Sequence, residues 1–176
     1  QHNIRMRAHT LMWHQQTPTW FFKKNYDDNE AVVDEATMNA RLEFFVRTVM
    51  RYTMQKEKEL TGEVGSIVYA WDVLNVYSLR SNAAAATTWV SVYGDMGLKP
   101  TYVKAAFEYA YDELKKENVQ DKVTLFYNDY DTYFSVDDEL ALISYINEGE
   151  EAKICGGIGM QSHVDIKRPT LEEYGN

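Results

Sequence analysis

The sequence predicts an α/β fold with a parallel sheet, and three observations support this prediction. Apolar runs typical of strands recur along the chain, segments with helical spacing separate them, and polar residues follow each run. Strands that alternate with helices favour βαβ units, whose crossovers are right-handed. Ligands of such folds meet the carboxyl ends of the strands, so the same pattern predicts where a site would lie.

The first third of the chain is predicted to hold one strand and one helix. A short strand pattern at residues 4–14 leads into a long polar and aromatic loop at residues 15–34. Asp34 is a candidate N-cap for a helix that runs to about Thr53, and the charged residues 55–63 are expected to form a surface connection. The apolar residues of this helix recur three and four positions apart and are Met38, Leu42, Phe45, Val46 and Val49.

A buried strand is predicted at residues 67–77, because β-branched and aromatic residues run without polar alternation up to Asp72. The small, polar residues 80–88 contain four consecutive alanines, which form either a helix start or an altered loop. Pro100 then precedes a helix that stops near Asn118. The apolar positions of that helix are Val103, Ala106, Phe107, Ala110 and Leu114.

Two further strands are predicted at residues 123–127 and 156–160. Between them, Ser135 with Asp138 resembles a capping box and would start a third helix. The inner face of this helix is expected to be formed by Leu140, Ile143 and Ile146.

Length and charge narrow the possible functions. A chain of 176 residues is long enough for one domain with a core. Its formal net charge of −9 makes nucleic acid and anionic membranes unfavourable partners and favours a neutral ligand. We expect no membrane span and no signal peptide within this chain, because it lacks a run of about 18 apolar residues and a charged-then-apolar start.

Four polar clusters, one at each predicted strand end, carry a family resemblance. The clusters are His9-Thr10-Leu11-Met12-Trp13-His14-Gln15-Gln16-Thr17-Pro18, Trp71-Asp72-Val73-Leu74-Asn75, Asn128-Asp129-Tyr130 and Gln161-Ser162-His163. In this order they resemble the family-ten glycoside hydrolases, the endo-1,4-β-xylanases. The resemblance implies a partial (β/α)8 TIM barrel, with residues 1–176 as a single incomplete barrel domain holding roughly the third to sixth βα units.

The resemblance also implies an activity. Family members are secreted, act on xylan or xylooligosaccharide, need no cofactor or metal ion, and cleave with retention through two glutamates. Here Val76 stands where the family has its acid/base glutamate. A valine cannot transfer protons, so general acid catalysis worth roughly 10²–10⁴-fold would be absent at this position. Ala8 and Asp131 also depart from the family's usual glycine and asparagine.

Three residues of the first cluster, His9, Trp13 and Gln16, resemble the family's sugar contacts around the cleavage point. Aromatic faces pack on pyranose rings, while amide and imidazole groups bond hydroxyls, so these residue types suit a sugar. His9 and His14 could instead suggest a metal site, but no nearby cysteine or carboxylate completes a ligand set.

The later clusters contribute three more candidates. Asn75 resembles the amide that holds the sugar's 2-hydroxyl, Tyr130 a platform on the leaving side, and His163 the histidine near the nucleophile. Without the other motifs, His163 would be interpreted as a structural histidine. Asp72 and Asp129 are interpreted as hydrogen-bond acceptors at strand ends instead of catalytic acids.

Three functions remain open at this stage. The chain could be the central part of a xylanase whose other units come from another chain, or a binder that holds xylooligosaccharide without cutting it. It could also be a half-barrel scaffold, natural or engineered. An open parallel sheet leaves two bare edges, which a complementary fragment or a second copy of the chain could cover.

Overall fold

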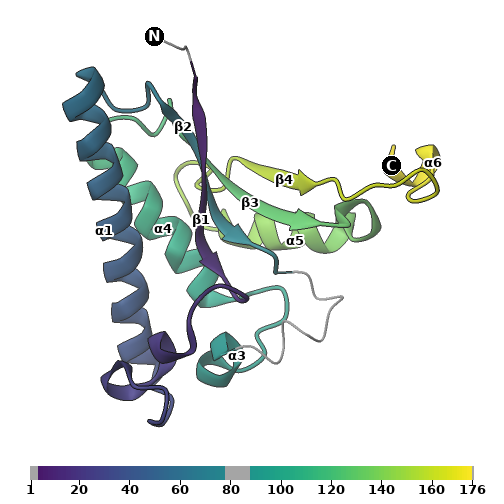
Figure 1. Ribbon diagram of the computed structural model, residues 1–176. Coiled ribbons are helices and arrows are strands. Elements are labelled where there is room, and N and C mark those ends of the chain that lie inside the picture. The colour runs from purple at the N-terminus through teal and green to yellow at the C-terminus, as the bar shows by residue number, and fades with distance from the viewer. Residues whose placement is uncertain (1–3, 78–87, 176) are drawn as a thin grey trace.

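A computed structural model describes residues 4–77 and 88–175 and contains one parallel sheet with the strand order β1-β2-β3-β4 (Figure 1). The strands are β1 (Met6–Trp13), β2 (Val68–Asn75), β3 (Thr124–Tyr130) and β4 (Gly157–Gln161). The helices are α1 (Glu35–Thr61), α3 (Thr88–Tyr93), α4 (Thr101–Lys116), α5 (Val136–Ile146) and α6 (Leu171–Tyr174), with short 3₁₀ helices η1 (Thr19–Phe22), η2 (Lys24–Tyr26) and η3 (Thr132–Phe134). The predicted alternation of strands and helices is confirmed.

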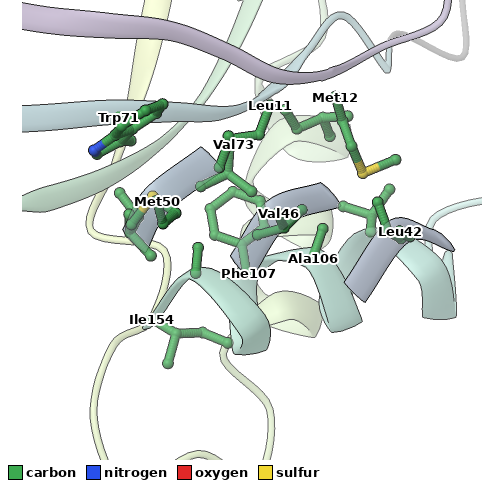
Figure 2. Packing of buried hydrophobic residues seen from close by; sticks show 14 of the residues in the cluster. Leu11, Met12, Leu42, Val46, Met50, Trp71, Val73, Ala106, Phe107 and Ile154 are labelled. Atoms are coloured by element: carbon green, nitrogen blue, oxygen red, sulfur yellow. The ribbon is translucent and has the colours of Figure 1, made fainter. Parts of the chain in front are cut away.

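The hydrophobic core lies between the sheet and its helices. Helix α4 packs between α1 and α5 and also contacts β2 and β3. Figure 2 shows side chains of β1 and β2 meeting side chains of α1 and α4. The residues labelled there from these four elements are Leu11, Met12, Trp71, Val73, Leu42, Val46, Met50, Ala106 and Phe107. Burial of such apolar surface is the main stabilising contribution to a fold of this kind.

Helix α1 begins as predicted but ends later. The Asp34 carboxylate accepts the Thr37 N–H at 2.8 Å, which confirms the N-cap. The predicted end near Thr53 and the surface connection at residues 55–63 are wrong, because Met54 and Glu57 continue the buried face of the helix. The helix ends where Gly62 adopts a left-handed backbone, with φ of 88°.

The third and fourth strands keep their predicted places, and the polar cluster of β3 belongs to the strand itself. Strand β3 was expected to end at residue 127 but continues to Tyr130, and Asp129 pairs with Met160 of β4. The polar side chains at residues 128–130 are therefore held by the backbone ladder of the sheet. A functional group placed on a strand is positioned more rigidly than one on a loop.

Helix α5 differs from its prediction in two ways. The predicted capping box is wrong, because the Ser135 hydroxyl donates to the Glu139 carboxylate and makes no cap hydrogen bond. Of the three residues predicted for the inner face, Ile146 is fully buried and Ile143 packs against the core, but Leu140 is 57% exposed. Glu139 and Leu142 take buried positions that the sequence did not predict. The polar Glu139 can take an inner position because Ser135 and Tyr127 are its hydrogen-bond partners there. The helix after Pro100 is confirmed as α4, whereas the alanine run lies outside the described residues.

Across residues 4–77 and 88–175, no helix combines the length and apolar character that a bilayer span requires.

Candidate functional site

The first group at the site surrounds the buried carboxylate of Asp72. His9 lies opposite Asp72 in the β1–β2 register, and its Nδ1 is 2.9 Å from the carboxylate. Arg7 donates to the same carboxylate from Nε at 2.7 Å, and its guanidinium lies over the Phe126 ring. This hydrogen bond to a buried carboxylate fixes the orientation of the His9 ring. Asp72 thus acts as a hydrogen-bond acceptor, as predicted.

A pocket of about 880 Å³ brings His9, Trp13 and Gln16 together. The ring centroids of His9 and Trp13 are 6.3 Å apart in an edge-to-face arrangement. Side chains of η1 and α1 form much of the remaining wall and include Trp20, Phe21, Arg41, Phe44 and Phe45. Mixed aromatic and polar walls of this kind are typical of ligand pockets.

A row of three amides connects the ends of β2, β3 and β4. The buried Asn75 accepts hydrogen bonds at Oδ1 from Asn128 Nδ2 and Gln161 Nε2, both at 2.7 Å. Gln161 Oε1 in turn lies 3.2 Å from Nε2 of His163. We call Asn75, Asn128 and Gln161 the amide row. No role was predicted for Asn128 or Gln161, although both belong to the motifs that carry the family resemblance.

Val76 occupies the turn directly after β2. It is 8% exposed and has a φ of 58°, a left-handed conformation that β-branched residues disfavour. Its N–H donates to the carbonyl of Asn128 at 2.7 Å. His14 lies close to this turn: burial lowers the pKa of its imidazole, and a hydrogen bond with the Val76 backbone and the charge of Asp129 oppose that shift.

The structure does not gather all the predicted site residues in one pocket. Asn75, Tyr130 and His163 do not line the pocket that holds His9 and Trp13. Tyr130 is half-buried at the end of β3, and His163 is exposed beyond β4. Since all four strands are parallel, these residues do share the carboxyl edge of the sheet. Their roles toward a sugar stay predictions.

The two histidines that could suggest a metal site, His9 and His14, lie in the part of the chain that the structure describes. Within it, no group of three or more histidine, cysteine, aspartate or glutamate side chains is arranged to hold an ion.

The family of this chain is settled by comparison with known proteins. The sequence profile of glycosyl hydrolase family 10 matches residues 1–176. The chain belongs to glycosyl hydrolase family 10. Its family-10 relatives are longer proteins. Endo-1,4-beta-xylanase A of Butyrivibrio fibrisolvens is 43% identical over 176 residues, which cover all of this chain and 40% of that protein. A putative endo-1,4-beta-xylanase of Caldicellulosiruptor saccharolyticus is 34% identical over 174 residues, which cover 98% of this chain and 50% of that protein.

Solved family-10 structures confirm the fold. The Clostridium thermocellum xylanase 10B, complexed with xylohexaose, is 31% identical with a TM-score of 0.66, and the match covers 93% of this chain and 31% of that one. An intracellular xylanase from Thermoanaerobacterium saccharolyticum is 28% identical with a TM-score of 0.71, and the match covers 92% of this chain and 45% of that one. The family-10 chain is therefore a partial TIM barrel, as predicted, and spans about half or less of the length of these relatives.

A buried carboxyl group in this family-10 chain makes stability depend on pH. Glu139 is 5% exposed, and burial together with the charge of Asp129 raises its pKa to about 7. The folded state therefore keeps a proton that the unfolded chain releases above its ordinary pKa of about 4.5. The stability from this proton is fully present below about pH 4.5 and is lost as the pH rises through 7.

We expect Glu139→Gln to remove this pH dependence, because the amide resembles the protonated acid. Relative to the parent, the free energy of unfolding of the variant should rise by up to about 3 kcal/mol between pH 4.5 and 8. Urea unfolding at several pH values measures the difference. Asp137→Asn, at an exposed neighbouring position, serves as the control. Parallel pH curves for parent and Glu139→Gln would contradict the prediction.

Proposed function

We propose that this chain is the central portion of a family-10 xylan-binding barrel and that it holds xylooligosaccharide without cleaving it. The observation that carries the proposal is Val76, a buried aliphatic side chain next to Asn75 at the end of β2. The resemblance puts the proton donor of the family at this position. The chain on its own would then bind the sugar and lack general acid catalysis.

Preorganisation of the polar groups supports the binding part of the proposal. Asp72 fixes the His9 ring, and Asn75 is fixed by two hydrogen bonds within the amide row. Groups that are already ordered lose little entropy when a ligand binds. The solved xylanase 10B of C. thermocellum was complexed with xylohexaose, which indicates the class of ligand to test.

The sheet edges favour an additional partner. In the described part of the chain, β1 and β4 each pair on one side only, and Met6 and Met160 on these strands are 54% and 45% exposed. Bare edges of a parallel sheet are unfavourable, so a complementary barrel fragment or a second copy of this chain would cover them. The 1–176 segment would then be a single incomplete domain.

The extracellular location expected from the resemblance stays a prediction, because the similar xylanase of T. saccharolyticum is an intracellular enzyme.

Titration calorimetry of the chain with xylotetraose tests the proposal. We expect binding by the parent and about a tenfold or greater loss of affinity in Trp13→Ala, since the indole would no longer pack on a sugar ring. Tyr52→Ala is the matched control, because Tyr52 is an aromatic residue of α1 that is 62% exposed and does not line the pocket. If the folded parent shows neither binding heat nor chemical-shift changes when xylotetraose is added, the proposed binding is contradicted. Sedimentation of the same sample as a monomer with an ordered sheet would argue against self-association.

A further inference from the structure

Asp129 connects the turn after β2 to the end of β3. Its side chain is fully buried, and Oδ2 accepts the backbone N–H of Tyr77 at 2.9 Å. Oδ1 accepts the backbone N–H of Tyr130 at 2.7 Å. The hydroxyl of Tyr127, two residues earlier on β3, donates to Oδ2 of the same carboxylate. One carboxylate thus holds the residue that follows Val76 and the last residue of β3 at a fixed spacing.

A second bond from β3 holds the same turn. The Val76 N–H donates to the carbonyl of Asn128, the residue before Asp129. Two consecutive amides, those of Val76 and Tyr77, therefore bond to two consecutive residues of β3. We call these two hydrogen bonds the β2–β3 clamp. The residue held by the clamp is Val76, a β-branched residue with left-handed φ. Such a conformation persists only where the surrounding structure enforces it.

The charge on Asp129 makes its half of the clamp the stronger one. Hydrogen bonds to an ionised acceptor are stronger than those between neutral groups, and a buried site strengthens them further. The other acidic group nearby, Glu139, has its pKa raised to about 7 by burial and by Asp129 itself. The Asp129 carboxylate accepts from three donors, the N–H groups of Tyr77 and Tyr130 and the Tyr127 hydroxyl, which is the arrangement that suits an ionised carboxylate.

We propose that Asp129 is a positioning residue for the sugar-binding edge: its carboxylate fixes the left-handed turn at residue 76 and so aims that side chain and the preceding Asn75 at the ligand. Asp129 is buried and does not touch the ligand itself. The inference rests on the proposed function for the identity of the ligand, but the clamp exists with or without a sugar.

Amide hydrogen exchange of the unliganded parent tests the clamp directly. We expect the Tyr77 amide to exchange as slowly as the amides inside β2, although Tyr77 lies outside the strand. Exchange at the rate of an open loop would overturn the proposal. This measurement needs no variant and no ligand, so it stands whether or not the proposed function holds.

Two variants of the same cluster separate positioning from general stability. Asp129→Asn keeps the size but removes the charge and one acceptor oxygen, whereas Tyr127→Phe removes only the hydroxyl that donates to Asp129. We expect Asp129→Asn to speed Tyr77 exchange and to weaken xylotetraose binding, each about tenfold or more. Tyr127→Phe should unfold more easily yet keep the parent affinity and a protected Tyr77 amide.

The outcomes are distinguishable. Equal losses of affinity in Asp129→Asn and Tyr127→Phe, or an unchanged Tyr77 amide in Asp129→Asn, would overturn the positioning role. If Asp129→Asn does not fold, the exchange rate of Tyr77 in the parent decides. If the folded parent does not bind xylotetraose, the proposed function fails, and the exchange data alone decide on the clamp.

Discussion

Replacing Val76 with glutamate is expected to raise xylan hydrolysis by about 10²–10⁴-fold once the remainder of a family-10 barrel is present. The glutamate would supply a proton to the leaving oxygen and later accept one from water, which valine cannot do. Retaining hydrolysis also needs a second carboxylate about 5–5.5 Å away, which the resemblance assigns to a strand that this chain does not include. The variant chain alone is therefore expected to stay inactive.

A chimera provides the missing part of the site. In it, this chain replaces the matched region of the B. fibrisolvens xylanase A, of which it covers 40%. Release of reducing sugar from xylan is compared between the chimera with Val76 and the chimera with Val76→Glu. Val76→Gln is the matched control, because glutamine has the size of glutamate but cannot exchange a proton. A folded Val76→Glu chimera that binds xylotetraose yet releases no sugar would contradict the assigned role of position 76.

The sequence predicted those features that depend on neighbours along the chain. The strands follow from apolar runs, and the start of α1 follows from Asp34 as an N-cap. Asp72 was correctly predicted as an acceptor from the site-like residues around it, although it lies inside β2 and not at the strand end. Each of these properties is set by local spacing and by the type of residue, which a single sequence displays.

The features that the sequence did not predict depend on contacts between distant segments. The amide row requires the register of three strands, since Asn75 and Gln161 are 86 positions apart. From its sequence context Glu139 is expected on the surface of α5. In the structure it lies on the inner face, where it contacts Ser135 and is close to Asp129, and these partners come from outside the helix. Tertiary packing overrides the local pattern at such positions.

Glu57 gives the other large expected effect, and it explains why α1 was predicted too short. The carboxylate of Glu57 is 4% exposed and accepts the backbone N–H groups of Gly65 and Val68, each at 3.0 Å, and of Ile67. It thereby joins the last turns of α1 to the first residues of β2. The charged run was predicted to be a surface connection because a sequence does not show that one of its glutamates points inward.

We expect Glu57→Ala to lower the free energy of unfolding by about 3 kcal/mol or more. Three N–H donors at the start of β2 would lose their acceptor, and a buried donor without a partner costs about 1–3 kcal/mol. Urea unfolding followed by tryptophan fluorescence measures the change. Glu59→Ala is the matched control, because Glu59 lies on the same turn of α1 and, within the described residues, bonds the exposed side chains of Gln55 and Lys56.

The control should change stability by no more than about 0.5 kcal/mol, as expected for an exposed ion pair. Equal stabilities of Glu57→Ala and Glu59→Ala would mean that water replaces the buried carboxylate without penalty, and Glu57 would then not anchor β2. A large loss in Glu57→Ala alone would place the anchor of β2 at its amino end. The carboxyl end of β2 is held separately, by the hydrogen bonds to Asn75 and Val76 from β3 and β4.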